Sequence, residues 1–239
     1  MRAQIQARPA LFVLDPRRAA VLVIDMQHDF GSEGGMFHRA GIDISAIRET
    51  VGPTASVLAA ARSMGMGVVY LKMGFRPDLS DAGSADSPNR VRHLFFGVGQ
   101  AVTAPDGRAS RILIRDTWNT DILPELAPRS GDAVIYKHRF SGFYDTELDA
   151  TLRAAGVDQL VVTGCTTSVC VESTIRDAMY RDYSCLLLSD CCAEPIGHEL
   201  ARSNHAASLL AIETVFGWVS DSATFLAAIE HAAMEPAAG

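Results

Sequence analysis

Three side chains that could act together in catalysis follow three apolar runs of the sequence. Asp25 ends the run "AAVLVID", Lys137 ends "DAVIYK", and Cys170 lies shortly beyond "QLVVTG". A thiol can attack a carbonyl carbon, a carboxyl group can take and return the proton, and an ammonium can stabilise the negative charge that develops. The sequence therefore indicates acyl-transfer chemistry, provided that the fold brings the three residues together.

The apolar runs themselves predict a parallel sheet. Short continuous runs rich in β-branched residues, separated by segments of helical pattern, are typical of strands that are buried on both faces. The predicted strands are Ala19–Asp25, Gly67–Lys72, Asp132–Lys137, Gln159–Gly164, Ser184–Asp190 and Ile212–Val219, with helices at about 50–64, 146–155, 170–181, 198–210 and 221–232. We expect a doubly wound α/β fold with a mainly parallel six-stranded sheet and helices on both faces.

Sheets of this kind bind ligands at the carboxyl ends of their strands, so the three residues should share one rim. Cys170 should begin a helix, where the helix dipole and a nearby Lys137 ammonium would favour the thiolate. The backbone N–H groups of Thr166 and Cys170, in the turn "GCTTSVC", could form an oxyanion hole. Taken singly, Asp25 could be a helix cap, Lys137 a solvated lysine and Cys170 a structural thiol. Their shared position favours the catalytic interpretation.

Length, charge and the lengths of the apolar runs limit which partners and which cellular location can be expected. The chain has 239 residues, which suits one α/β domain, and the long connection at about 73–120 should lie near the site. With 21 Lys and Arg against 28 Asp and Glu, the formal charge is −7, which argues against nucleic acid and anionic membranes as partners. The apolar run "ALFVL" is too short for a signal peptide core, and no run could span a bilayer. We therefore expect a cytoplasmic protein.

Other catalytic and metal-binding motifs are absent from the sequence. Five cysteines without a CxxC pair indicate neither a disulfide framework nor a zinc knuckle, and "HELARSNH" has Arg202 where a zinc motif needs its second histidine. There is no GxSxG or GxxxxGK motif and no complete dinucleotide fingerprint. No cofactor and no metal are expected.

Three longer segments resemble the signature segments of the isochorismatase-like cysteine hydrolases. They are "VLVIDMQHDF", "AVIYKHRFSGFYDTELD" and "VVTGCTTSVCVESTIRDAMYRDY", and the resemblance extends from about residue 15 to residue 225. It implies that Asp25, Lys137 and Cys170 are the catalytic triad and that the Cys165–Thr166 bond is a non-proline cis peptide that directs the Thr166 N–H into the oxyanion hole. Nicotinamidases of this superfamily hold a metal where this chain reads "YLKMGFRPD", so no metal site is implied.

Finer resemblances concern the substrate. "CVESTIRD" and "IETVFGWVSD" resemble the ureidoacrylate amidohydrolases of uracil catabolism, whereas "GFRPDLSDA" and "CLLLSDCC" resemble biuret hydrolases. Both kinds of enzyme act on ureido or carbamoyl groups. The resemblance thus implies a metal-independent amidohydrolase that cleaves a linear C–N bond of a small N-carbamoyl compound through a thioester, in a homo-oligomer (dimer or tetramer). Ureidoacrylate is the favoured substrate. Biuret, triuret or another small amide is the alternative, and a non-catalytic binding protein of the same fold is the alternative of a different class.

Several residues near the predicted site are candidates for binding the substrate. Arg139 could pair with a substrate carboxylate or form an internal salt bridge, and Trp118 could equally belong to the core or to a subunit contact. By the resemblance, Phe30 replaces a tyrosine, and Met73 and Phe75 replace a polar and a larger aromatic residue. The candidate substrate-binding residues are Phe30, Met73, Phe75, Arg76, Trp118, Asn119 and Arg139.

Overall fold

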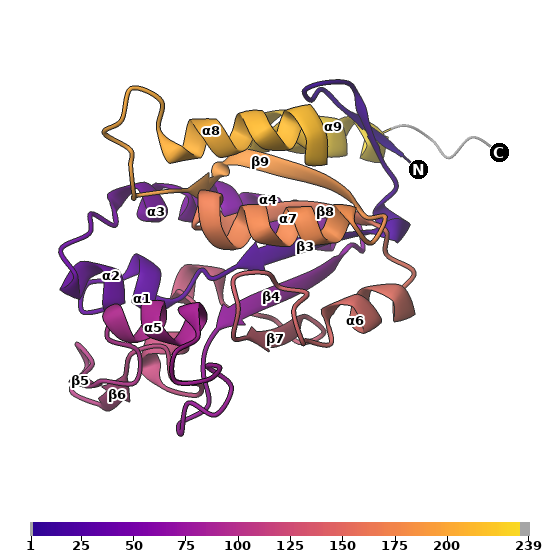
Figure 1. The fold of residues 1–239 in the computed structure, drawn as a ribbon. Coiled ribbons are helices and arrows are strands. Elements are labelled where there is room, and N and C mark those ends of the chain that lie inside the picture. Colours follow the sequence, from indigo (N-terminus) through magenta and orange to yellow (C-terminus); the bar gives the residue numbers. More distant parts are fainter. Residues whose placement is uncertain (1, 235–239) are drawn as a thin grey trace.

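A computed structural model describes residues 2–234 and is built around a six-stranded parallel sheet (Figure 1). The strands lie in the order β10–β9–β8–β3–β4–β7, and each neighbouring pair is parallel. Their bounds are β3 Ala19–Ile24, β4 Gly67–Met73, β7 Ala133–Lys137, β8 Gln159–Cys165, β9 Ser184–Ala193 and β10 Trp218–Ser220. The predicted fold class is confirmed.

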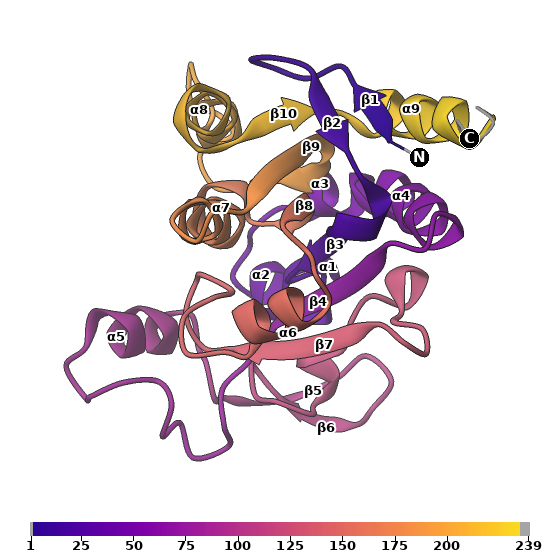
Figure 2. The same cartoon turned by 90° about the vertical axis from the view of Figure 1, so that its right-hand side faces the viewer.

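Helices cover both faces of this sheet (Figure 2). One face carries α6 (Leu148–Ala154), α7 (Glu172–Met179) and α8 (Asn204–Ala211), and the other carries α4 (Val51–Ser63) and α9 (Ser222–Met234). Val21 and Leu22 are adjacent in β3, point to opposite faces, and are both 0 % exposed. Burial on both sides explains why the strands read as unbroken apolar runs rather than as an alternating pattern.

The last apolar run does not form the single strand that the sequence predicts. Residues Ile212–Phe216 make a π-helical turn that continues α8, and only Trp218–Ser220 pairs with β9. Gly217 joins the two parts, and a Cβ at this position would lie 2.6 Å from the Cys185 carbonyl oxygen. An apolar run alone does not distinguish a buried helical turn from a strand, which is why the prediction of strand Ile212–Val219 was wrong.

Shorter elements complete the described chain. They are the hairpin of β1 (Ala3–Ile5) and β2 (Phe12–Leu14), η1 (Pro16–Arg18), α1 (His28–Gly31), α2 (Met36–Arg39), α3 (Ser45–Glu49), η2 (Trp118–Thr120) and η3 (Pro124–Leu126). Figure 1 shows α1 and α2 at the carboxyl ends of the strands, with α5 beside them. Across residues 2–234, no helix is both long and apolar enough to cross a membrane.

The connection after β4 is more ordered than its composition suggested. It contains the helix α5 (Pro88–Phe95) and the hairpin of β5 (Ala101–Thr103) and β6 (Ala109–Arg111). Ser87 caps α5, because its side chain accepts a hydrogen bond from the Arg90 N–H, and Pro88 occupies the first turn, where its missing N–H costs no helical bond. The connection thereby places a rigid helix next to the ends of the central strands.

Candidate active site

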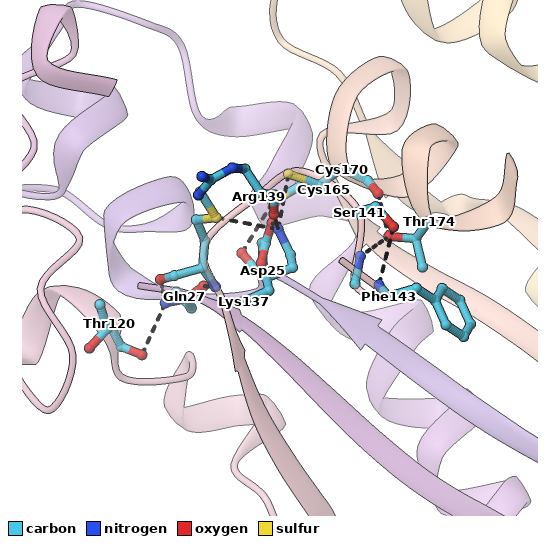
Figure 3. Close-up of polar contacts among 12 residues, drawn as sticks. Asp25, Gln27, Thr120, Lys137, Arg139, Ser141, Phe143, Cys165, Cys170 and Thr174 are labelled. Atoms are coloured by element: carbon cyan, nitrogen blue, oxygen red, sulfur yellow. Dashed lines mark hydrogen bonds and ion pairs between the residues drawn. The ribbon is translucent and has the colours of Figure 1, made fainter. Parts of the chain in front are cut away.

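The strand order brings the three predicted catalytic residues together at the carboxyl edge of the sheet. Asp25 follows β3 and Cys170 follows β8, and these two strands are neighbours at the point where the chain changes direction across the sheet. Lys137 ends β7, two strands from β3, and its long side chain passes over the end of β4 (Figure 3). Its Nζ lies 2.8 Å from Asp25 Oδ2 and 3.3 Å from Cys170 Sγ.

Close packing of β3 against β8 fixes the position of Asp25. Gly164 has φ of +124°, and a Cβ there would lie 2.1 Å from the Ile24 carbonyl oxygen, so only glycine fits. Asp25 itself adopts φ of 55°, and its N–H donates to the Leu71 carbonyl oxygen at 2.9 Å. The chain therefore leaves β3 in a sharp turn that directs the Asp25 carboxyl group across the strand ends.

A π-helical turn carries the thiol. Thr167–Val171 forms this turn before α7, and the Thr166 carbonyl oxygen accepts from the N–H groups of Val169 and Val171. The Thr174 hydroxyl donates to the Cys170 carbonyl oxygen at 2.7 Å and accepts from the Gly142 N–H at 3.0 Å (Figure 3). Thr174 thus links the segment that follows Lys137 to the helix that follows Cys170.

The peptide bond before Thr166 is cis, as the family resemblance implies. Thr166 and Cys170 both line the same cavity. Within the described chain, the Thr166 N–H donates no hydrogen bond to another residue. This buried donor is therefore available to a ligand beside the thiol, as an oxyanion hole requires.

Lys137 and Asp25 form a buried ion pair, each 0 % exposed. Burial raises the pKa of Asp25 above its ordinary value, although Lys137 and Cys170 act in the opposite direction. Burial alone would lower the pKa of Lys137, but the neighbouring Asp25 and Cys170 outweigh it and raise that pKa. Lys137 is therefore a permanent ammonium, and Asp25 is a carboxyl group that can take up a proton more readily than a solvated aspartate.

Cys170 is less acidic than the sequence predicted. Burial raises the pKa of its thiol, the charge of Asp25 raises it further, and Lys137 offsets this only in part. The expectation of a thiolate at the start of a helix does not hold, because packing removes the sulfur from water more effectively than the local charges stabilise its anion. The proton must therefore leave the sulfur during attack, toward Asp25.

A cavity of about 210 Å³ opens onto Cys170. Two of the candidate substrate-binding residues, Phe30 and Met73, line it, and Phe75 lies behind the wall, with its ring centroid 4.9 Å from that of His93. The full lining is Phe30, Met36, Phe37, Met73, Arg92, His93, Phe96, Leu113, Phe140, Thr166, Val169, Cys170 and Ile196. The walls are thus mainly apolar, with the reacting groups at one end.

Trp118 and Asn119 are not among the residues that line this cavity. The Trp118 ring stacks on the His28 ring with centroids 4.4 Å apart. Asn119 is fully buried and uses its side-chain amide to donate to Asp29 and to accept from the Ser110 hydroxyl. Both residues therefore hold neighbouring segments of the protein together. Their side chains do not line the cavity in which a ligand would lie beside Cys170.

Arg76 and Arg139 also lie outside the cavity, along a separate polar depression. The Arg139 guanidinium donates to the carbonyl oxygens of Asp81 and His138 at 2.8 and 2.7 Å, so it is already engaged. Its own carbonyl oxygen lies 3.3 Å from Lys137 Nζ, and this backbone contact helps to hold the ammonium in place (Figure 3).

Gln27 is a positioning residue that the sequence analysis missed. Its side-chain Nε2 donates to the carbonyl oxygens of Met73 and Thr120 at 3.0 and 3.1 Å, and its Oε1 accepts from the Met73 N–H at 2.7 Å. These bonds fix Met73 beside Lys137, where the sulfur lies 3.5 Å from Nζ. The sequence signal that could have identified this residue is an amide side chain two positions after Asp25, at the carboxyl end of a predicted strand.

Asp29 joins three segments around the cavity, and its replacement should destabilise the fold. Its carboxyl oxygens accept from the N–H groups of Met36 and Leu113 and from the Asn119 amide, and burial raises its pKa to about 6. Asp29→Asn points an NH₂ group at one of these donors, so we expect a loss of about 2–4 kcal/mol in the free energy of unfolding, measured by urea denaturation. Asp145→Asn, at an exposed carboxyl, is the control. Equal stability of the two variants would contradict this role.

Comparison with known proteins shows a family match along most of the chain. Residues 19–224 match the family described as "Isochorismatase domain". The chain is 40% identical over 233 residues to "Ureidoacrylate amidohydrolase RutB" of Methylobacterium radiotolerans, a match that covers 98% of this chain and 88% of the relative. Within residues 2–234, no group of three or more His, Cys, Asp or Glu side chains is arranged to hold a metal ion.

Solved structures show the same architecture. A cysteine hydrolase from Pseudomonas syringae pv. phaseolicola 1448A superposes with a TM-score of 0.78 at 32% identity, over 96% of this chain and 98% of that one. N-carbamoylsarcosine amidase from Thermoplasma acidophilum superposes with a TM-score of 0.62 at 28% identity, over 86% and 96%. A parallel sheet that holds an acid, an ammonium and a thiol at its carboxyl edge has the arrangement of a cysteine hydrolase. The chain belongs to the isochorismatase family.

Proposed function

We propose that this amidohydrolase cleaves the C–N bond of a ureido group with Cys170 as the nucleophile, and that ureidoacrylate is its substrate. The observation that carries the proposal is the contact of one buried ammonium, Lys137 Nζ, with both Asp25 and Cys170. The similarity to an enzyme named for ureidoacrylate and to an amidase named for N-carbamoylsarcosine supports the choice of a carbamoyl compound.

The first half of the reaction transfers the carbamoyl group to sulfur. As the Cys170 sulfur attacks the ureido carbonyl carbon, its proton passes to the Asp25 carboxylate. The resulting oxyanion accepts hydrogen bonds from the N–H groups of Thr166 and Cys170. The C–N bond then breaks, Asp25 returns the proton to the departing nitrogen, and aminoacrylate leaves while a carbamoyl thioester remains.

The second half restores the thiol. Water attacks the thioester carbonyl while Asp25 accepts its proton, and the same N–H groups stabilise the second oxyanion. The C–S bond breaks, the sulfur regains a proton from Asp25, and carbamate leaves and decays to carbon dioxide and ammonia. Lys137 stabilises negative charge on the sulfur and on the carboxylate throughout, so the proposed mechanism requires no metal.

Location and assembly belong to the same proposal. A cytoplasmic location is supported by the five cysteines, all of them free and buried, since thiols persist in a reducing compartment. A homo-oligomer is supported by large apolar side chains on the surface of α5, among them Phe95, which is 81 % exposed. Light scattering of the purified protein measures the assembly.

Ammonia release from a panel of amides tests the proposed function. The panel contains ureidoacrylate, biuret, triuret, N-carbamoyl amino acids and nicotinamide, each with and without prior EDTA treatment of the enzyme. We expect release from ureidoacrylate that EDTA does not change. Release from biuret or triuret alone would overturn the choice of substrate, and loss of activity with EDTA would overturn metal independence. If no compound in the panel releases ammonia, the ureido assignment is overturned.

The pH profile of kcat/KM should report the raised pKa of Asp25. The carboxylate must be ionised to accept the thiol proton, and burial raises its pKa above the ordinary 3.8. We expect kcat/KM to fall as the pH drops through this raised pKa, so that the acid limb lies above the range of a solvated aspartate. Asp29, with a pKa of about 6, could produce a similar limb. Asp29→Asn should therefore leave the limb in place, and its disappearance in that variant would contradict the assignment to Asp25.

A further inference from the structure

One cation lines the cavity beside Cys170. Among the residues of the described range 2–234 that form the cavity wall, Arg92 of α5 is the only lysine or arginine. Its side chain makes no hydrogen bond or ion pair with any residue of the described chain, and its carbonyl oxygen accepts only backbone bonds. Arg90, one half-turn earlier, differs, because its Nη1 donates to the carbonyl oxygens of Leu79 and Gly83. Arg92 is thus an exposed arginine that borders both this cavity and a shallower outer depression, and its side chain has no partner within the described chain.

The next residue, His93, does not compete with Arg92 for an anion. It is buried, and its Nδ1 lies 2.6 Å from the Asn89 carbonyl oxygen, so Nδ1 carries the hydrogen. Burial lowers the pKa of His93, and the charge of Lys137 lowers it further, although the bond to Asn89 acts in the opposite direction. The imidazole is therefore neutral and leaves Nε2 as an acceptor. Positive charge available to a ligand at this end of the cavity comes from Arg92.

We propose that Arg92 binds the carboxylate of the substrate and so selects ureido acids over neutral ureas. This inference rests on the proposed function, which places the carbamoyl carbon at Cys170. A cavity of about 210 Å³ holds one small molecule, so a ligand bound at the thiol has its other end near the remaining polar wall. Phe30, Phe140 and Met73 then contact the flat hydrocarbon between the two ends.

The geometry of arginine favours this assignment. A guanidinium presents a planar fork of donors that matches a carboxylate, and such charge-assisted pairs are among the stronger polar contacts in proteins. The protein as a whole has a formal charge of −7, so an anionic substrate needs a local cation to enter the site. Arg139, the candidate suggested by the sequence, is already engaged by two carbonyl oxygens outside the cavity.

Steady-state kinetics with a charged and an uncharged substrate test the assignment. Ureidoacrylate and its methyl ester differ only in the carboxylate. Arg92→Gln should raise KM for ureidoacrylate about 10- to 100-fold, with kcat changed much less and with KM for the ester unchanged. Arg92→Lys keeps the charge but not the fork, so it should give an intermediate KM. Arg108→Gln removes an exposed arginine elsewhere and controls for the change in net charge.

Two outcomes would overturn the inference. They are an equal rise of KM for both substrates in Arg92→Gln, and an unchanged KM for ureidoacrylate. Titration calorimetry with the Cys170→Ala protein, with and without Arg92→Gln, separates this inference from the proposed function, because it needs no turnover. Binding of ureidoacrylate that depends on Arg92, in an enzyme that releases no ammonia from it, would support the anion site and overturn the proposed reaction. Binding that is indifferent to Arg92 would overturn the anion site even if the reaction proceeds.

Discussion

Cys170→Ala is expected to reduce ammonia release from the substrate by about 10⁴-fold or more while the protein stays folded. Among the described residues that line the cavity, Cys170 carries the only thiol, and its sulfur lies 3.3 Å from Lys137 Nζ. Removal of one buried sulfur from the end of the cavity leaves the sheet and its two cores intact. Steady-state assays and a thermal melt measure the two properties.

A second buried cysteine provides the control. Cys185 lies in β9, away from the cavity, and burial raises its pKa to about 12. Cys185→Ala should lower the melting temperature by at least as much as Cys170→Ala and leave turnover close to the wild-type rate. Ammonia release that survives in Cys170→Ala, or that is lost equally in both variants, would remove Cys170 from the mechanism.

Lys137→Met should abolish activity and also destabilise the protein by about 3–5 kcal/mol, because it leaves the buried Asp25 carboxylate without its partner. Lys137 is 0 % exposed, so water cannot replace the ammonium without opening the core. Methionine has a similar length and fills the space, which makes the lost charge the main change. Urea denaturation at neutral pH measures the loss of stability.

The double variant separates electrostatics from packing. Asp25→Asn with Lys137→Met removes both charges of this buried pair, so it should be more stable than Lys137→Met alone while remaining inactive. If the two substitutions instead destabilise additively, the ion pair is not what holds these side chains in place. A Lys137→Met enzyme that keeps wild-type kcat would show that the ammonium has no part in the reaction.

The positions of the three central residues could be predicted from the sequence because Asp25 and Lys137 end apolar runs and Cys170 follows one, and such runs, repeated between helical segments, are typical of a parallel sheet. The strand order then brings Asp25 and Cys170 together at neighbouring strands, and the length of the Lys137 side chain bridges the remaining distance. The acidity of the thiol could not be predicted in this way. The direction in which the pKa of Cys170 shifts depends on how completely the surrounding elements bury the sulfur. A local sequence pattern does not contain that information.

The substrate end of the site was harder to predict. Arg92 and His93 lie on α5, whose start was signalled by Ser87 and Pro88 but was interpreted as part of an irregular connection. Arg139 was favoured because it lies close to Lys137 in sequence, but β7 ends at Lys137, so the alternation of a strand does not fix where the Arg139 side chain points. Which polar groups face a cavity follows from packing between segments that are distant in the sequence.

Rapid acid quench followed by mass spectrometry of the Cys170 peptide tests the central claim most directly. An activated carbamoyl ester, 4-nitrophenyl carbamate, transfers the same carbamoyl group as a ureido substrate but has a better leaving group, so acylation becomes fast and the thioester accumulates. We expect the mass of one carbamoyl group on the peptide that contains Cys170, and on no peptide with another of the five cysteines. Turnover of the ester with the Cys170 peptide unmodified, or with the carbamoyl group on a different cysteine, would contradict the account.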